Sequence, residues 1–556
     1  MEIEVDAEAT MRDGTILRAD VYRPTDEGPW PVLLERTPYG RRRNLQSFVN
    51  PFDAVSRGYI LIRQDSRGRP NSEGHWLPFT YEVEDGHDTV RWAAALPGSS
   101  GVVGMLGGSY TGNTQWAAAI AAPPELRAIV PQITWCDPSD GLHFRGGAIE
   151  LGLNGSWTLS TGAAEVAARA DDPAEAAAAL AAIAADHDAL ATRNYWELPA
   201  GALPAIARHN VKDIGVQRAL ADPSNADGAT VAGKHSTVEA ASLNVGGWFD
   251  VFQQGTLDNY TAMAAQGKPA RLIVGPWTHG AAGVMSSLSP GIAGETNFGL
   301  ASTQDGAAVG DLTLNWYDCW LKGIRNGIDA EPPVKIYVMG INQWRDESEW
   351  PLARAVDTPW YLGTDASLTP AEPTGEQAPD QYHYDPADPV ITRGGNLVMA
   401  GEFPAGQFDQ AVTEQRDDVL TYTSEPLAED LEVTGRVRMR LHAATDAPST
   451  DWVVRLCDVD TDGVSRNLCD GILRTRATPG EPGDHEIDLW STSNVFRAGH
   501  RIRVQVTSSN FPRWDRNLNT GEPARTAVTM RTAQQTIFHD AVRPSQIILP
   551  VVPPTS

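Results

Sequence analysis

Cysteine is scarce in this chain of 556 residues, and long apolar runs are missing. Its four cysteines are too few and too scattered for a disulfide framework, and they lack the spacing of a zinc finger. No stretch reaches the roughly 18 uninterrupted apolar residues that cross a membrane. The first six residues are acidic and contain no apolar segment of a secretory signal. We therefore expect buried free thiols and a cytoplasmic location.

Positive charge is also scarce, because 44 Lys and Arg stand against 71 Asp and Glu, a formal net charge of −27. Such an excess of negative charge is repelled by nucleic acid and by anionic membranes. We expect neither as a partner, and the sequence leaves a homo-oligomer open. The composition, 41% apolar and 21% charged, is that of a globular protein. The length predicts several domains, since one core rarely serves more than about 250–300 residues.

Short apolar runs alternate with helical segments in the first quarter of the chain. Strands are predicted at residues 16–22, 31–35, 59–62 and 102–106, with an amphipathic helix at 84–95. Strands that alternate with helices, and that are apolar throughout, indicate a parallel α/β sheet. The same character returns at 242–245, 271–274 and 334–339. We expect one α/β domain built from residues 1–141 and 241–351.

The two remaining segments differ from this pattern. Asp172 and Pro173 precede an alanine-rich stretch, which is a good helix start and predicts a helical insertion at 142–240. Beyond residue 352, Val437, Met439 and Leu441 alternate with arginines. A period of two is typical of strands with one solvated face. We expect an all-β sandwich, a jelly roll, at 352–556.

Ser109 stands in a tight turn where a predicted strand meets a predicted helix. The sequence Gly-Gly-Ser-Tyr-Thr-Gly at 107–112 follows the strand at 102–106 and precedes a helix at 113–122. A Gly-x-Ser turn in this context is typical of the nucleophile elbow of α/β-hydrolases. The second glycine follows the serine by three positions instead of the usual two. A tight turn without a catalytic role is the alternative.

A nucleophilic serine requires a base and an orienting acid, and in this fold the acid precedes the histidine. Asp250 follows the strand at 242–245, and His279 follows the strand at 271–274. Each residue taken alone is equally compatible with an ordinary loop carboxylate, a helix cap or a structural histidine. Together with Ser109, in the required order and at strand ends, they predict a catalytic triad.

Stabilisation of an oxyanion requires hydrogen-bond donors beside the nucleophile. The backbone N–H of Tyr110 is one donor by position. The loop after the strand at 31–35 commonly supplies the second, and Tyr39 in that loop offers its hydroxyl. A purely structural aromatic at position 39 fits the sequence equally well.

These motifs together resemble the family of serine hydrolases that contains cocaine esterase and the X-prolyl dipeptidyl aminopeptidases, the CocE/NonD type. The resemblance covers nearly the whole chain and includes the Ser-Tyr-x-Gly elbow. It implies an α/β-hydrolase core with an inserted helical cap and a C-terminal jelly roll. It also implies Ser109 as nucleophile, His279 as base, Asp250 as orienting acid, Tyr39 and Tyr110 as oxyanion donors, and no metal or organic cofactor. The matching segments are residues 12–15, 36–39, 64–68, 107–112, 247–250, 275–279, 467–474 and 508–512.

The substrate class is less closely defined by the resemblance. Amino-acid ester hydrolases of the family resemble each other in placing acidic residues two and three positions after the catalytic aspartate, where this chain has Phe252 and Gln253. X-prolyl peptidases carry a large extra N-terminal helical domain, whereas strand signals begin here within the first 25 residues. A small-molecule acyl or aryl ester is therefore the expected substrate, and Gln46, Phe144, Trp157 and Phe252 are expected to line its pocket.

Two further hypotheses remain beside the carboxylesterase. One is an enzyme that cleaves amide bonds, either an X-prolyl dipeptidyl peptidase or an acylase that acts on amide or β-lactam side chains. The other is a non-enzymatic carbohydrate-binding protein built on the jelly roll, because a fold alone does not fix a function. A binding protein has no need for a serine, an aspartate and a histidine at three strand ends.

Overall fold

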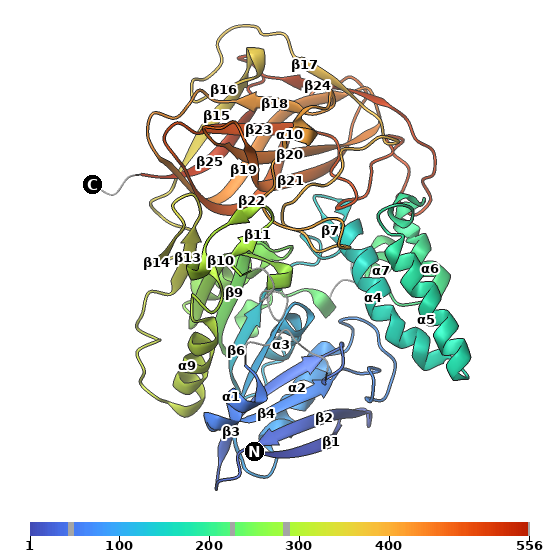
Figure 1. The fold of residues 1–556 in the computed structure, drawn as a ribbon, viewed down its shortest axis with the longest axis vertical. Helices are drawn as coiled ribbons and strands as arrows, with labels where there is room; N and C mark the ends of the chain where they lie inside the picture. Colours follow the sequence, from blue (N-terminus) through green and yellow to red (C-terminus); the bar gives the residue numbers. More distant parts are fainter. Residues whose placement is uncertain (43–48, 223–227, 282–289, 554–556) are drawn as a thin grey trace.

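The computed structural model describes residues 1–42, 49–222, 228–281 and 290–553. It has three parts: an α/β core that holds the N-terminus, a group of helices at one side, and a β-rich part that ends the chain (Figure 1). This is an α/β-hydrolase core with a helical cap and a C-terminal β domain, as expected from the sequence. Within the described residues, no helix combines the length and the apolar character needed to cross a membrane.

The core is a ten-stranded sheet in the order β1-β2-β4-β3-β5-β6-β9-β10-β13-β14. Its central strands, from β4 to β13, run parallel, and antiparallel strands close both edges. Because all carboxyl ends of the parallel strands meet at one edge, the loops after them gather there. The strands are β1 (Glu2–Thr10), β2 (Ile16–Arg23), β3 (Trp30–Thr37), β4 (Ile60–Asp65), β5 (Ser99–Gly108), β6 (Leu126–Gln132), β9 (Ala241–Phe249), β10 (Ala270–Thr278), β13 (Val334–Val338) and β14 (Gln343–Glu347).

Helices cover both faces of this sheet, which is why its central strands are mostly buried and apolar. Successive residues of β3 show the two faces. Val32 and Leu34 pack in the cluster that holds Val90 and Trp116, whereas Leu33 packs in the cluster that holds Trp316. The first face carries α2 (Glu82–Ala94), α3 (Tyr110–Ile120) and α8 (Gln253–Ala265), and the second carries α1 (Pro51–Ser56) and α9 (Val309–Lys322).

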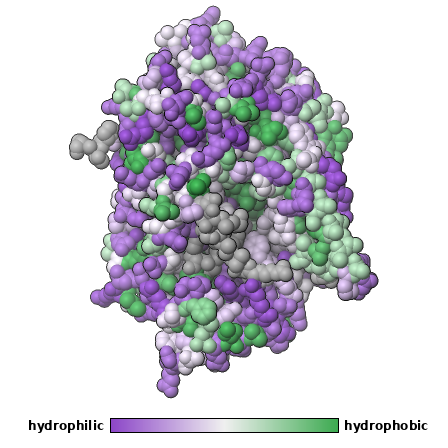
Figure 2. Space-filling model, in the orientation of Figure 1, coloured by the Kyte–Doolittle hydropathy of each residue, from purple (hydrophilic) through white to green (hydrophobic). Residues whose placement is uncertain are grey.

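The helical cap lies at one side of the molecule, beside the core and next to the C-terminal part (Figure 1). Asp172 caps the second long helix as predicted, because its side chain accepts hydrogen bonds from the N–H groups of Ala174 and Glu175. That helix is largely exposed, and the pale green of its alanines marks it in Figure 2. The cap helices are α4 (Leu151–Arg169), α5 (Pro173–Asp188), α6 (Pro204–His209) and α7 (Val216–Ala221).

The cap is joined to the C-terminal part through a buried carboxyl group at the start of α4. Glu150 accepts a hydrogen bond from Trp514 Nε1 at 2.7 Å. Burial raises the pKa of Glu150 to about 7, and the nearby charge of Arg513 opposes that rise. Burial therefore favours a protonated carboxyl group at mildly acidic pH, and the hydrogen bond from Trp514 opposes this effect.

The C-terminal part is largely β, as predicted, and includes the short helix α10 (Ala411–Glu414). Its apolar core is continuous with residues of β9, α8, β10 and β13 of the α/β core. In β19 the inward residues Val437, Met439 and Leu441 are buried, and Arg438 and Arg440 are partly or fully exposed. The strands pair in the order β17-β24-β19-β25-β15-β16-β18-β23-β20-β21, and β22 pairs with β19. They are β15 (Val356–Gly363), β16 (Ser367–Thr369), β17 (Asp380–Tyr384), β18 (Leu420–Thr423), β19 (Leu431–Thr445), β20 (Ser449–Val459), β21 (Ser465–Arg476), β22 (Gly483–Phe496), β23 (Arg501–Thr507), β24 (Ala533–Phe538) and β25 (Gln546–Val552).

Candidate active site

Ser109 forms the turn between β5 and α3 and adopts φ 59° and ψ −122°. A positive φ is strained for a residue with a side chain, and such strain is typical of a serine presented at a sheet edge. Gly112 explains why the second glycine is displaced by one position. A Cβ atom there would lie 2.8 Å from Thr134 Cβ, so α3 packs against the segment after β6 only because the residue is glycine. Thr111 occupies the usual glycine position and donates to the Gly108 carbonyl at 2.8 Å.

The structure brings Ser109, His279 and Asp250 into one hydrogen-bonded chain. His279 Nε2 lies 3.0 Å from Ser109 Oγ, and His279 Nδ1 lies 2.7 Å from Asp250 Oδ2. Asp250 and His279 follow β9 and β10, which are adjacent and parallel, as predicted. Asp250 is fully buried, and its other carboxylate oxygen accepts the N–H of Phe252 at 2.5 Å. Both oxygens of Asp250 are therefore fixed by hydrogen bonds, which orients the imidazole toward the serine.

Tyr39 and the start of α3 flank the serine on the cavity side. Trp157 Nε1, on helix α4, donates to the Tyr39 hydroxyl oxygen at 3.1 Å. The Tyr39 proton is then free to point at a bound carbonyl oxygen. Burial raises the pKa of the Tyr39 hydroxyl, with the Trp157 hydrogen bond opposing the rise, so the hydroxyl remains a donor at neutral pH. Tyr110 is the first residue of α3, and its N–H has no carbonyl partner within the helix.

The side chain of Tyr110 holds the start of α3 in place. Its hydroxyl donates to Glu82 Oε1 at 2.9 Å and accepts the N–H of Phe79 at 3.1 Å. Glu82 also forms an ion pair with Arg36 at 2.7 Å, and both side chains are buried. The Phe79 ring stacks on the Tyr110 ring at a centroid distance of 4.4 Å. This network orients the backbone N–H that follows Ser109.

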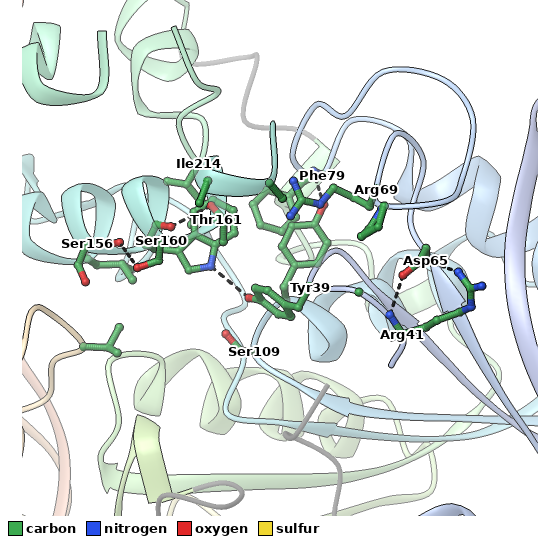
Figure 3. A pocket seen from close by; sticks show the side chains of 18 of the residues that line it. Tyr39, Arg41, Asp65, Arg69, Phe79, Ser109, Ser156, Ser160, Thr161 and Ile214 are labelled. Atoms are coloured by element: carbon green, nitrogen blue, oxygen red, sulfur yellow. Dashed lines mark hydrogen bonds and ion pairs between the residues drawn. The ribbon is translucent and has the colours of Figure 1, made fainter. Parts of the chain in front are cut away.

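A cavity of about 970 Å³ opens onto Ser109 and His279 (Figure 3). Figure 3 shows Tyr39 beside Ser109, and Ser156, Ser160 and Thr161 of α4 across the cavity. The predicted pocket residues Trp157 and Phe252 line it, and the Phe252 ring lies edge-on to His279 at 5.3 Å. Other lining residues that the sequence did not suggest include Arg69, Phe79, Trp135, Leu153, Ile214 and Val398.

The other two residues predicted to line the pocket are Phe144 and Gln46. Phe144 lies in β7 (Phe144–Arg145), packs edge-on against His143, and is not among the residues that line the cavity. The turn at 146–147 explains this, because it directs the short hairpin toward β21 of the C-terminal part, where Arg474 N donates to the Gly146 carbonyl. Gln46 lies outside the described residues.

The C-terminal part reaches the segment that carries Asp250. Gln253 Nε2 donates to the Ser491 carbonyl at 2.6 Å, and Ser491 N donates to Gln254 Oε1 at 3.0 Å. Asn396 Nδ2 donates to the Trp248 carbonyl at 2.7 Å. The start of α8 is thereby fastened to strand β22. No pattern in the sequence indicates these contacts, because the partners are separated by 148 to 238 residues.

Two family models match the chain. One is X-Pro dipeptidyl-peptidase (S15 family), over residues 13–281, and the other is X-Pro dipeptidyl-peptidase C-terminal non-catalytic domain, over residues 326–548. The cocaine esterase of Rhodococcus sp. (strain MB1 Bresler) is 35% identical, and the match covers 98% of this chain and 97% of that protein.

Solved structures show the same architecture over the whole length. An aminopeptidase from a marine sediment archaeon, Thaumarchaeota archaeon, superposes with a TM-score of 0.82 at 28% identity, covering 98% of this chain and 96% of that one. An α-amino acid ester hydrolase superposes with a TM-score of 0.79 at 24% identity, over 99% and 96% of the two chains, which shows the shared fold. The chain therefore belongs to the family of α/β-hydrolases that contains cocaine esterase and the X-Pro dipeptidyl-peptidases.

Proposed function

We propose that this enzyme hydrolyses small carboxylic esters through an acyl-enzyme on Ser109, with His279 as the base and Asp250 as the orienting acid. The observation that carries the proposal is the hydrogen-bonded chain from Ser109 through His279 to Asp250, at the floor of an open cavity. The sequence similarity to an esterase, which extends over 98% of this chain, supports the same reaction class. The protein is an ester-hydrolysing serine enzyme, and the role of each residue is part of the proposal.

In the first half of the reaction, Ser109 Oγ attacks the ester carbonyl carbon while its proton passes to His279 Nε2. Asp250 stabilises the imidazolium that forms. The carbonyl oxygen gains negative charge and accepts hydrogen bonds from the Tyr39 hydroxyl and the Tyr110 N–H. When the tetrahedral intermediate collapses, the C–O bond to the alcohol breaks, and the alcohol oxygen takes the proton from His279.

In the second half, water replaces the alcohol. His279 Nε2 removes a proton from the water as its oxygen attacks the acyl carbon, and the same two donors hold the second oxyanion. Collapse breaks the bond to Ser109 Oγ, which recovers its proton from His279. The products are the free acid and the resting enzyme, and no other reactant is consumed.

The cavity favours a small acyl or aryl group beside the serine. Its volume of about 970 Å³ lies within the usual range for small-molecule sites. Aromatic rings of Phe79, Trp135, Trp157 and Phe252 form much of its wall near the triad. Apolar walls of this kind bind the hydrocarbon parts of a substrate and displace water from around them.

An aminopeptidase acting after proline is the second candidate, because both matching family models bear that name and a similar structure is an aminopeptidase. Such an enzyme must bind the ammonium group of the substrate, which requires an acceptor with negative charge. Among the described residues that line the cavity, Asp65 is the one carboxylate. It forms an ion pair with Arg41. The cavity therefore favours the ester over a peptide with a free amino terminus.

Purified wild type and Ser109→Ala test the proposal on four substrates: p-nitrophenyl acetate, p-nitrophenyl butyrate, an aminoacyl ester and a Gly-Pro anilide. We expect turnover of the simple esters by the wild type and a loss of several orders of magnitude in the variant. Faster cleavage of the Gly-Pro anilide than of the esters would establish the peptidase instead. Equal ester turnover by both proteins would exclude Ser109 as nucleophile.

We also propose that the enzyme works in the cytoplasm. Cys136, Cys457 and Cys469 are buried free thiols and Cys319 is a half-buried one, which suits a reducing compartment. Fractionation of cells that express the native gene, followed by esterase assay and immunoblot, tests the location. Recovery of the enzyme outside the cytoplasmic fraction would contradict it.

A further inference from the structure

We propose that Arg69 binds a carboxylate group of the substrate, so that the enzyme prefers esters whose acid or alcohol part carries a second carboxylate. This inference rests on the ester hydrolysis proposed above and specifies its substrate class. It starts from an arginine that lines the catalytic cavity, is 5% exposed, and has no ion-pair partner within 4.0 Å among the described residues.

Arg69 follows β4 at the same sheet edge as the triad. Its guanidinium lies over the Trp76 ring at 4.4 Å, and its Nε donates to the Pro38 carbonyl. Pro38 directly precedes Tyr39, and in Figure 3 the Arg69 side chain extends beside Tyr39 and Phe79. The stacking and the single hydrogen bond fix the guanidinium plane, and they leave its two terminal nitrogens without a hydrogen bond to any described residue. Each of these two nitrogens retains some solvent-accessible surface.

A missing ion-pair partner is unusual among the buried arginines of the described residues. Six of them have a carboxylate within 4.0 Å: Arg36, Arg41, Arg145, Arg271, Arg455 and Arg513. Arg516 lacks one and instead donates from both terminal nitrogens to carbonyl oxygens, of Pro386 and Trp196. Removing a guanidinium from water costs several kcal/mol unless the charge is paired. Among these buried arginines, Arg69 is the one whose two terminal nitrogens both lack a hydrogen bond to a described residue.

The carboxylates nearest to Arg69 do not complete the pair. Glu165 on α4 exerts the strongest attraction on Arg69, yet it lies beyond ion-pair distance and accepts the N–H of Lys212 at 3.1 Å. Asp65 is paired with Arg41. The two other arginines among the described residues that line the cavity are compensated, because Arg41 and Arg42 both bind Asp20. Within this described lining, Arg69 is therefore the arginine whose charge a substrate can still neutralise.

One guanidinium among aromatic walls suits a carboxylate better than a phosphate. A carboxylate brings one charge and two oxygens, which match the two parallel N–H donors of the fork. A phosphate monoester carries about two charges at neutral pH, and the second would stay uncompensated in this apolar cavity. The inferred substrates are half-esters of dicarboxylic acids, or esters of alcohols that bear a carboxylate.

Two matched substrate pairs test the inference. The acyl pair is p-nitrophenyl hemiglutarate and p-nitrophenyl methyl glutarate, and the alcohol pair is the butyrate ester of 4-hydroxybenzoate and that of its methyl ester. The measured quantity is the ratio of kcat/KM, free acid to capped form, in each pair. We expect Arg69→Met to lower this ratio about 10- to 100-fold in one pair, as expected for a lost hydrogen bond to a charged group. Arg69→Lys should retain part of it.

Arg42→Met is the matched control, since it removes a charge from the same cavity where Asp20 already compensates it. The ratio in that variant should stay within about threefold of wild type, because its charge is half-exposed and screened. A structural role for Arg69, for example in holding Pro38 and Tyr39, would slow both members of a pair equally. An unchanged ratio in both pairs for Arg69→Met would overturn the inference.

Ligand binding by the wild type needs neither a folded variant nor turnover. Calorimetry should show the monoamide of glutaric acid, which carries one carboxylate, binding at least tenfold tighter than glutaramide, with competition by the neutral ester. Equal binding of the two, or none, would refute the role of Arg69 even if the esters are hydrolysed. Binding of the monoamide by an enzyme that hydrolyses no ester would refute the proposed function and leave the carboxylate site standing.

Discussion

The hydrogen bond from Trp157 to Tyr39 predicts a specific defect when Trp157 is replaced by phenylalanine. The substitution keeps an aromatic ring that can stack near Tyr110, where the two rings are now 6.4 Å apart and nearly parallel, and it removes the Nε1–H that lies 3.1 Å from the Tyr39 oxygen. A neutral hydrogen bond contributes about 0.5–1.5 kcal/mol, which corresponds to roughly 2- to 13-fold in rate. We expect kcat on p-nitrophenyl butyrate to fall by this factor, because the Tyr39 hydroxyl is then less well oriented to donate to the oxyanion.

A double-mutant cycle separates positioning from packing. Tyr39→Phe removes the oxyanion donor itself, so in that background Trp157→Phe has no hydrogen bond left to remove. The second substitution should then change kcat by less than about twofold, and the coupling energy should equal the cost of the single Trp157 change. If Trp157→Phe costs the same with and without the Tyr39 hydroxyl, Trp157 acts by shaping the cavity and the reasoning fails.

Three further predictions concern single side chains. Asp250→Asn should keep the fold and lower kcat by roughly 10³–10⁴-fold, because an amide holds the imidazole in the wrong tautomer; near-normal stopped-flow rates would place the acid elsewhere. Tyr39→Phe should cost about 10²–10³-fold in kcat, and activity within twofold of wild type would remove Tyr39 from the oxyanion site. Glu150→Gln concerns stability. The pKa of the Glu150 carboxyl group rises from 4.5 in the unfolded chain to about 7 in the folded protein. The free energy of unfolding of the wild type therefore falls by about 3 kcal/mol as the pH rises through this range. The melting temperature of Glu150→Gln relative to wild type should therefore increase between pH 4.5 and pH 8, and a difference independent of pH would contradict the buried ionisation.

The sequence predicts the triad because each of its members follows a strand whose central residues are buried on both faces. Runs such as residues 102–106 identify buried strands without ambiguity, and small residues mark the turn at Ser109. The same rule ends one strand too early, because β9 continues to Phe249, beyond the predicted end at residue 245. Gly247 lies inside the sheet, where the close approach of the Trp277 backbone leaves no room for a side chain.

Features outside the continuous apolar runs were not predicted in this way. Strand β1 is a largely exposed edge strand in which Ile3, Val5, Ala7 and Ala9 alternate with acidic residues, and this period of two was not used to predict a strand. The hydrogen bond between Trp157 and Tyr39 spans 118 residues, and no pattern in either segment points to the other. Arg69 directly follows a segment noted for the family resemblance, residues 64–68, beyond the carboxyl end of β4. Only the structure shows that its charge has no ion-pair partner among the described residues.

The attachment of Gln253 and Gln254 to Ser491 has a consequence for how this enzyme changes under mutation. The start of α8 is held by the second sheet, and Asp250 lies three residues before Gln253. Substitutions in strand β22, far from the substrate along the chain, therefore act on the acid that orients the imidazole. Selection for catalytic rate and selection for a well-packed β domain then constrain the same strand. Improved variants from random mutagenesis should accordingly include changes near residue 491, although no atom of that residue contacts the cavity.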